Sequence, residues 1–363
     1  MGRQDVILST GLSDSLKAAV EQIVHDRLFV LTDETTLHLC WPLISPLPCM
    51  QGAQMITIAP TDENKTLESL AHVWTALQQG GATRRSLLIC LGGGMVTDLG
   101  GFAASTFKRG IAYINVPTTL LSMVDAAVGG KTGINFGGLK NEVGVFNGAK
   151  AVILDAEFLR TLDHENLLSG YAEMLKHGLI STTEHWLELL TFDLDNIDYA
   201  RLTQLVAKSV KVKERIVEED PHEHGIRKAL NLGHTVGHAF ESLALEEHRT
   251  VLHGYAVAWG LVCELYLSAV RMDFPHDKFY QTRLFIKEHY GKFPFTCKHY
   301  PRLLELMAHD KKNLEAGQVN FTLLADIGDI RINQTASKEE IEDMFDFRNG
   351  NGTCNGVPRQ AKV

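Results

Sequence analysis

The segment SLLICLGGGMVTDLGGF, residues 86–102, decides the fold of the N-terminal half of the chain. It begins as an apolar run of strand length, passes through three glycines at 92–94 and continues with apolar residues at helical spacing. This order predicts a buried strand, a tight turn and a helix. Glycines let a backbone approach a ligand closely, and the free N–H groups of a helix start suit a pyrophosphate. The pattern is not GxGxxG, so a tight turn without a ligand is the alternative.

Outward from this segment, similar apolar runs alternate with helical patterns. Strands are predicted at RLFVLTD (27–33), QMITIAP (54–60), IAYINVPTT (111–119) and AVILD (151–155), and helices at 65–80 and 95–106. This alternation is typical of a parallel α/β sheet. From about residue 160 onward, long stretches with helical spacing replace it. We therefore expect an α/β domain over residues 1–155, a mostly α-helical domain over 156–346, and a polar, disordered tail over 347–363.

The composition limits the classes of function. A length of 363 residues suits two domains, and 45% hydrophobic with 22% charged residues is typical of a globular protein in solution. A net charge of -9 argues against general affinity for nucleic acid or anionic membranes. The six cysteines are scattered without CxxC and no secretory signal is visible, which favours a cytoplasmic location. The longest apolar tract, 255–270, contains Glu264 and predicts a buried helix.

Two histidines, His234 and His238, stand four residues apart at the start of a predicted helix. This spacing puts both imidazoles on one helix face, where they can share a metal, although ordinary helix histidines fit it equally. Thr235 replaces the glutamate of HExxH, which disfavours that class of metalloprotease. A third ligand can come from His253 or Glu173. The alternatives are that His253 caps a helix and that Glu173 pairs with a histidine of its own helix. A Glu/His/His set suits Zn²⁺ or Co²⁺ acting as a Lewis acid.

Charged and amide side chains are concentrated around the glycine-rich segment 116–144. This segment holds Asp125, Lys131, Lys140 and Asn141, and further cations stand at Arg109, Lys176, Lys213 and Arg227. Arg227 lies one helical turn before Asn231 and two before His234, so these three residues are expected on one face of the same helix. Taken singly, each fits a solvated surface. If they converge, their ligand carries more than one negative charge, such as a phosphate and a carboxylate. Asp33, at the end of a predicted strand, is a candidate for binding ribose hydroxyls or for a helix N-cap.

Several longer motifs make the chain resemble the dehydroquinate synthase family. They are GGGMVTDLGGF, FKRG, VPTTLLSMVD, VGGKTGIN, LKNEVG, YAEMLKHG, IRKALNLGHTVGHAFE and LHGYAVAWG, and the resemblance covers about residues 27–345. It implies a Rossmann-like NAD-binding α/β domain joined to a helical metal- and substrate-binding domain, with the active site in the cleft between them. The implied reaction converts 3-deoxy-D-arabino-heptulosonate 7-phosphate to 3-dehydroquinate in the shikimate pathway, with NAD⁺ that is regenerated and a divalent metal.

The resemblance also implies residue roles. The metal ligands would be Glu173, His234 and His253, which leaves His238 to shuttle protons. The NAD-site residues would be Asp33, Asp62, Lys65, Gly93, Gly94, Met95, Asp98, Thr118, Thr119, Leu121, Asp125, Lys131 and Lys140. The substrate-site residues would be Asp125, Lys131, Asn141, Lys176, Lys213, Arg227, Asn231 and one lysine of the pair Lys311–Lys312. Arg109 would reach the substrate phosphate in the neighbouring subunit, so the family relationship implies a homodimer.

The chain departs from the family pattern in two places. The loop PTDENK (60–65) keeps an acid before Lys65 but lacks the usual GE pair, and Ala126 and Ala127 stand where two serines are common. Both departures concern contacts to the cofactor. The alternatives are another sugar-phosphate cyclase and a metal-dependent NAD polyol dehydrogenase, although a polyol needs no such set of cations. A binding module without catalysis would show gaps among the metal and cationic positions, and all of these are filled.

Overall fold

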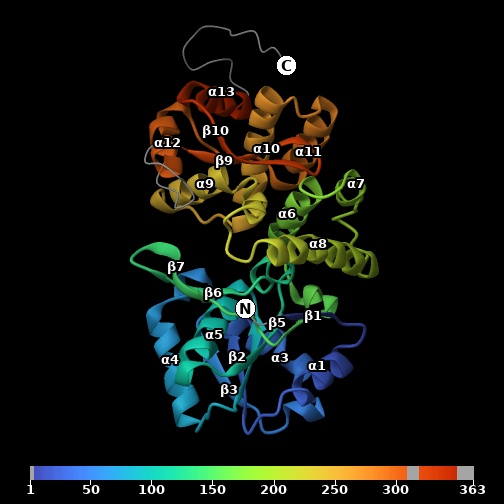
Figure 1. Ribbon diagram of the computed structural model, residues 1–363, viewed down its shortest axis with the longest axis vertical. Coiled ribbons are helices and arrows are strands. Elements are labelled where there is room, and N and C mark those ends of the chain that lie inside the picture. The colour runs from blue at the N-terminus through green and yellow to red at the C-terminus, as the bar shows by residue number, and fades with distance from the viewer. Residues whose placement is uncertain (1–3, 309–318, 350–363) are drawn as a thin grey trace. The chain divides into compact units, whose positions relative to one another are not determined.

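The computed structural model describes residues 4–308 and 319–349 (Figure 1). The chain forms two compact units. The first contains the residues up to Gly170 together with Asp198–Glu214, and the second contains Tyr171–Ile197 and the residues from Arg215 onward. This division differs from the domain boundary expected at residue 155. The reason is that the chain stays in contact with the first unit beyond that point, as the 3.6 Å distance between Oγ1 of Thr161 and Sγ of Cys40 indicates.

A six-stranded sheet with parallel neighbours forms the centre of the first unit, in the order β1-β8-β5-β4-β2-β3. Its strands are β1 (Asp5–Leu8), β2 (Leu28–Asp33), β3 (Gln54–Ile58), β4 (Leu87–Gly92), β5 (Ala112–Pro117) and β8 (Ala151–Leu154). The apolar run that opens the glycine segment is β4, which is buried along its whole length between β2 and β5. Because β2, β4 and β5 are parallel neighbours, the loops that follow them meet at one edge of the sheet.

Helices connect these strands. They are α1 (Leu12–Glu21), α2 (Glu34–Leu39), α3 (Trp41–Ile44), α4 (Leu67–Gln79) and α5 (Gly94–Thr106), with short η1 (Pro48–Met50), η2 (Asp62–Asn64), η3 (Phe107–Arg109), η4 (Ser122–Ala126) and η5 (Ala156–Thr161). Glycines allow α5 to lie directly on β4. A Cβ added at Gly100 would stand 2.4 Å from Cys90 Sγ, and one at Gly92 would stand 2.6 Å from the Val96 side chain. The glycine segment is therefore required for close helix–strand packing as well as for the turn.

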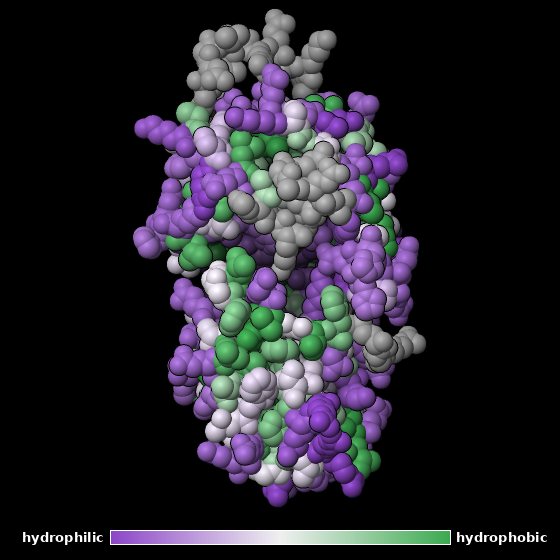
Figure 2. Space-filling model, turned by 60° about the vertical axis from the view of Figure 1, so that its left-hand side comes forward, coloured by the Kyte–Doolittle hydropathy of each residue, from purple (hydrophilic) through white to green (hydrophobic). Residues whose placement is uncertain are grey.

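A two-stranded antiparallel hairpin, β6 (Lys131–Phe136) and β7 (Leu139–Phe146), packs on α5. Its turn is formed by Gly137 and Gly138, which both have positive φ. Every residue of β7 is exposed, including apolar ones. Figure 2, which brings the hairpin side of the molecule forward, shows hydrophobic side chains gathered over this unit.

The second unit is mostly helical. It contains the end of α6 (His164–Leu179) and of α8 (Tyr199–Glu219), then α7 (Thr183–Leu190), η6 (Ile226–Asn231), α9 (His234–Glu246), α10 (His253–Met272), α11 (His276–Tyr290), η7 (Cys297–His299), α12 (Tyr300–Ala308), β9 (Asn320–Asp326), β10 (Asp329–Thr335) and α13 (Lys338–Asn349). The tract 255–270 lies within α10 and is largely buried, as predicted. Phe240 of α9 packs against Phe293 and Phe295, with ring centroids 4.7 and 5.3 Å apart.

The predicted fold class, a parallel α/β unit followed by a helical one, is confirmed. The antiparallel pair β9–β10 was missed, and the tail prediction was wrong for its first residues. Phe347 stacks on Tyr266 with ring centroids 4.7 Å apart, and Arg348 is buried, so α13 continues over part of the supposed tail. Residues 350–363 lie outside the described residues. Among the helices of the described ranges, none has the length and hydropathy needed to cross a membrane.

Candidate metal and nucleotide sites

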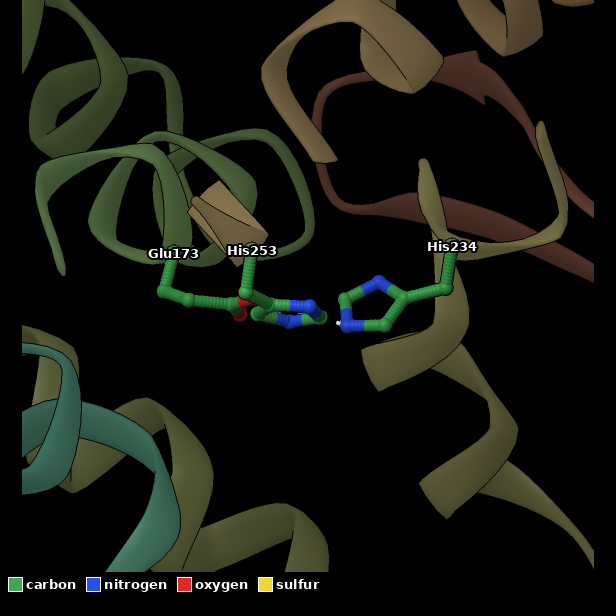
Figure 3. A group of neighbouring side chains, drawn as sticks. All are labelled: Glu173, His234 and His253. Atoms are coloured by element: carbon green, nitrogen blue, oxygen red, sulfur yellow. Dashed lines mark ion pairs between the residues drawn. The ribbon is translucent and has the colours of Figure 1, made fainter. Parts of the chain in front are cut away.

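Glu173, His234 and His253 point toward one another from three helices of the second unit (Figure 3). Glu173 lies in α6, whereas His234 and His253 are the first residues of α9 and α10. Oε1 of Glu173 is 3.4 Å from Nε2 of His234 and 3.3 Å from Nε2 of His253. Glu173 is fully buried, and this oxygen accepts no hydrogen bond from the described residues. A buried carboxylate oxygen that faces two imidazole nitrogens fits a divalent cation.

The surrounding charges keep Glu173 ionised. Burial would raise the pKa of Glu173, but the charges of Lys176 and His234 hold that pKa well below its ordinary value. Lys176, which was expected at the substrate, is buried and donates a hydrogen bond to Oε2 of Glu173. Burial would lower the pKa of His253, but Glu241 and Glu173 raise it to about 10. A cation that binds here therefore replaces a proton, as at other metal sites.

The second ring nitrogen of each candidate ligand also has a polar partner. Nδ1 of His234 lies 3.2 Å from the carbonyl oxygen of Leu232, and Nδ1 of His253 lies 3.1 Å from Oε2 of Glu241. Partners of this kind leave Nε2 available for a metal. Glu241 was not predicted from the sequence. Its position one turn after His238 and two turns after His234 puts it on the same face of α9, and this spacing was the available signal.

His238 lies beside the first group of ligands. Its ring centroid is 5.3 Å from that of His234 and 6.0 Å from that of His253. His238, Glu241 and His253 form a second group whose potential ligand atoms all lie within 4.8 Å of one another. The second group is more exposed than the first, in which Glu173 and His234 are both buried.

Arg227 and Asn231 belong to η6, which ends before α9 begins. The expectation that they share one helix with His234 was therefore wrong. Gly233 takes the left-handed conformation, with φ of 81°, and this break separates the two helices. Arg227 is buried, and the carboxylate of Asp220 accepts hydrogen bonds from the backbone N–H groups of His224, Gly225 and Arg227. This loop anchor was also missed by the sequence analysis.

The predicted nucleotide residues of the first unit follow neighbouring strands of the sheet. Their positions are Asp33 at the end of β2, Gly93, Gly94, Met95 and Asp98 after β4, and Thr118, Thr119 and Leu121 after β5. Asp33 is the N-cap of α2, where its carboxylate accepts a 2.7 Å hydrogen bond from the N–H of Thr36. The N-cap alternative is thus correct for Asp33, and its contact with a ribose stays a prediction. Gly93 stands at the N-cap of α5, which is the position suited to a pyrophosphate.

A buried lysine links predicted cofactor and substrate residues of the first unit. Nζ of Lys65 lies 2.6 Å from Oδ2 of Asp98 and also donates a hydrogen bond to Oδ1 of Asn141. Burial raises the pKa of Asp98, and the charge of Lys65 opposes that rise. Asp62 lies 3.9 Å from Lys65 and 3.7 Å from the ammonium of Lys140. The unusual loop at 60–65 therefore keeps its acid next to both lysines.

The remaining predicted site residues come from different parts of the chain, and each has its own position and contacts. Nζ of Lys213 donates hydrogen bonds to the carboxylate and to the backbone oxygen of Asp125. Lys131 is exposed at the start of β6. Arg109 has a positive φ of 70° and belongs to an open pocket of about 450 Å³, which is lined by Ala82, Thr83, Arg84, Lys108 and Arg109. The pair Lys311–Lys312 lies outside the described residues.

Solved structures of other proteins share this fold. A 2-epi-5-epi-valiolone synthase from Streptomyces hygroscopicus, with NAD⁺ and Zn²⁺ bound, matches with a TM-score of 0.84 and 24% identity, over 96% of this chain and 98% of that one. A 2-deoxy-scyllo-inosose synthase complexed with carbaglucose-6-phosphate, NAD⁺ and Co²⁺ matches with a TM-score of 0.81 and 22% identity, over 95% and 96%. At these identities the likeness establishes the fold alone.

Sequence relatives establish more. Residues 55–169 match the family described as 3-dehydroquinate synthase N-terminal, and residues 170–313 match 3-dehydroquinate synthase C-terminal. The 3-dehydroquinate synthase of Parabacteroides distasonis is 54% identical over 347 residues, which cover 96% of this chain and 98% of the relative. That of Pyrococcus abyssi is 36% identical, over 92% of this chain and 97% of the relative. By these matches, the chain belongs to the 3-dehydroquinate synthase family.

Proposed function

We propose that this chain converts 3-deoxy-D-arabino-heptulosonate 7-phosphate to 3-dehydroquinate and phosphate, as a carbon–oxygen lyase of the shikimate pathway. The observation that carries the proposal is that the imidazoles of His234 and His253 both face Oε1 of Glu173. This oxygen is buried and accepts no hydrogen bond from the described residues. The chain that contains these three residues has sequence relatives that are named 3-dehydroquinate synthase. The cytoplasm is the compartment we propose, because the scattered cysteines fit a reducing environment.

Two bound groups belong to the proposal. Glu173, His234 and His253 would hold Zn²⁺ or Co²⁺, the ions bound in the two cyclase structures described above. When bound, the ion supplies Lewis acidity that polarises a substrate hydroxyl. The turn at Gly93 and Gly94 would hold NAD⁺ through the free N–H groups of α5. When bound, the nicotinamide would supply a reversible hydride acceptor, which is why NAD⁺ is expected to be needed only in catalytic amount.

The chain itself binds and orients an anionic substrate. Lys131, Asn141, Lys176, Lys213, Arg227 and Asn231 are the proposed contacts, and a lysine of the pair Lys311–Lys312 is added to them. Lys213 and Lys176 already pair with Asp125 and Glu173, so these carboxylates hold the ammonium groups in place before a substrate arrives. His238 is proposed to move protons to and from the substrate, because an imidazole works as both acid and base near neutral pH.

A homodimer is the proposed assembly, with the β6–β7 hairpin at its interface. Phe136, Leu139 and Phe146 of the hairpin are 54%, 59% and 47% exposed, and Val143 and Val145 are exposed beside them. Apolar side chains gathered in this way favour association with another protein surface. Arg109, which is exposed, would contact the substrate phosphate in the second copy, so each active site would need both subunits.

The test is a phosphate-release assay with the purified chain and 3-deoxy-D-arabino-heptulosonate 7-phosphate. We expect release that requires NAD⁺ in catalytic amount and Zn²⁺ or Co²⁺, stops after addition of a chelator, and leaves no NADH. Steady NADH formation on glycerol would identify a polyol dehydrogenase instead. Preferential turnover of a heptulose phosphate without a carboxylate would identify another sugar-phosphate cyclase. Absence of phosphate release with metal and cofactor present refutes the proposal.

A further inference from the structure

The two ring nitrogens of His253 face two different carboxylates. Nε2 lies 3.3 Å from Oε1 of Glu173, and Nδ1 lies 3.1 Å from Oε2 of Glu241. Glu173 reaches the ring from α6, and Glu241 reaches it from α9. The Glu241 side chain is only 12% exposed, so this contact is made in a largely enclosed place. His253 therefore lies between two carboxylates. The inner one, Glu173, belongs to the proposed metal set, and the outer one, Glu241, has no role assigned so far.

The outer carboxylate could serve a second ion, because His238, Glu241 and His253 also form a group of potential ligands. The chemistry of the imidazole argues against this. If Nε2 binds one ion, Nδ1 carries the only remaining ring proton, and a second ion there requires that proton to leave. A neutral imidazole keeps this proton far above neutral pH, so Nδ1 acts as a hydrogen-bond donor and needs an acceptor. Glu241 stands at hydrogen-bond distance and supplies one.

His234 is supported in another way, and the contrast shows what Glu241 adds. Nδ1 of His234 faces the carbonyl oxygen of Leu232, two residues earlier in the same chain segment. That partner is backbone and follows from the local conformation. His253 is the first residue of α10 and its partner is a side chain of α9. The orientation of the His253 ring thus depends on one residue of another helix.

We infer that Glu241 is a positioning residue that fixes the tautomer and the ring orientation of His253 for metal binding. Helix α9 then supplies one ligand, His234, directly and orients a second, His253, through Glu241. Partners of this kind raise the basicity of a ligand histidine and change metal affinity by about tenfold to a hundredfold. The inference rests on the proposed metal set of Glu173, His234 and His253.

Metal titration of the apo protein tests this directly. The wild type, Glu241→Ala and Glu241→Gln are stripped of metal, and Co²⁺ and Zn²⁺ dissociation constants are measured by competition with a chromophoric chelator. We expect Glu241→Ala to bind about tenfold to a hundredfold more weakly. Glu241→Gln keeps an acceptor oxygen for Nδ1–H, so it should retain most of the affinity. The visible absorption of bound Co²⁺ should change in Glu241→Ala, since the geometry of the His253 ligand changes.

The matched control is Glu247→Gln. Glu247 follows the last residue of α9 and also pairs with a histidine, His299, at 3.2 Å, but this pair is separate from both groups of potential metal ligands. We expect its affinity and Co²⁺ spectrum to equal those of the wild type. Thermal unfolding of each apo variant checks that the fold is retained. If Glu241→Ala does not fold, Glu241→Leu takes its place, because leucine keeps most of the side-chain volume and offers no acceptor to Nδ1 of His253.

Three outcomes overturn the inference. The first is wild-type affinity and an unchanged Co²⁺ spectrum in Glu241→Ala. The second is binding of two equivalents of metal by the wild type, with one lost in both Glu241→Ala and His238→Ala, which would make the outer group a second metal site. The third is an equal loss in Glu241→Gln and Glu241→Ala, which would assign the effect to charge. Failure of the wild type to bind any metal refutes the proposed metal set instead, so the two failures are distinguishable.

Discussion

Oε2 of Glu264 accepts a 2.7 Å hydrogen bond from the backbone N–H of Gly233, so a carboxylate in the middle of α10 caps the start of α9. Its other oxygen accepts a 3.2 Å hydrogen bond from the N–H of Val236. A carboxylate at a helix N-terminus satisfies free N–H groups and interacts favourably with the helix dipole. The candidate ligand His234 lies between the two bonded residues. Glu264, which interrupts the apolar tract in the sequence, therefore fixes the backbone on which this ligand stands.

Replacing Glu264 with Gln should weaken both the fold and metal binding. The amide has one acceptor oxygen, so one of the two backbone N–H groups would face an NH₂ group in a fully buried place. We expect the free energy of unfolding to fall by about 1–3 kcal/mol. Urea unfolding of the apo protein measures this loss, and chelator competition measures the metal affinity. Glu305→Gln, at a side chain that is 54% exposed in α12, is the control and should change neither quantity. An unchanged unfolding midpoint in Glu264→Gln would contradict the capping role.

Substitutions of the proposed metal ligands and of His238 should affect metal binding and turnover differently. We expect Glu173→Gln and His234→Ala to lose bound metal, because each removes one of the three proposed ligands. His238→Ala should keep the metal and lose turnover, because its role is proton transfer. Metal content of the purified variants, set against their rates of phosphate release, decides the matter. Loss of metal from His238→Ala would place this histidine among the ligands.

The pattern of residues was sufficient for the class of fold. Continuous apolar runs predicted β2, β4 and β5, because parallel strands buried on both faces need no alternation. The same reasoning missed the break at Gly233, since a glycine within a helical pattern does not reveal its sign of φ. It also missed Glu241 and Glu264. These carboxylates act on residues of another helix, and the packing of helices is not encoded in the spacing along either one.

Lys65→Met should destabilise the protein in a pH-dependent manner. Lys65 is buried, and its charge opposes the rise in the pKa of Asp98 that burial causes. Without Lys65, the folded-state pKa of Asp98 rises further above its ordinary value of 3.8. A carboxyl group whose pKa is higher in the folded than in the unfolded state favours folding at low pH, where it is protonated. This contribution is lost as the pH rises through the folded-state pKa. The loss of stability of Lys65→Met relative to the wild type should therefore grow from about pH 4 toward neutrality. At neutral pH, removal of one partner of a buried pair costs about 3–5 kcal/mol.

Urea midpoints of the wild type and Lys65→Met between about pH 4 and pH 8 measure this deficit. The double variant Lys65→Met/Asp98→Asn removes both charges and should recover most of the loss, since no uncompensated charge stays buried. A deficit of equal size at every pH would show that lost packing, and not the Asp98 charge, accounts for the effect.

The hairpin proposal predicts a change of oligomeric state. Replacing Leu139 with Lys and Phe146 with Glu puts charges on two exposed apolar positions of β7. If these side chains are covered by a second copy, the charges would have to be buried there, and the dimer should dissociate. Sedimentation equilibrium measures the dissociation constant. Leu187→Lys, at an exposed leucine of α7 in the other unit, is the control and should leave the dimer intact. A dimer of unchanged affinity in the double variant would place the interface elsewhere.

The proposed sharing of Arg109 between subunits predicts that two inactive variants restore activity when mixed. Arg109→Ala would damage the site of the partner, whereas His238→Ala would damage the site of its own subunit. In a mixed dimer, one site would then contain an intact His238 and the intact Arg109 of the other subunit, and the second site would lack both. Because random exchange makes half of the dimers mixed and one site in each of these intact, about a quarter of the wild-type activity should return. Refolding the variants together from denaturant and assaying phosphate release measures this recovery. If Arg109 instead acts within its own subunit, each site in the mixed dimer keeps one defect and activity stays at the level of the separate variants.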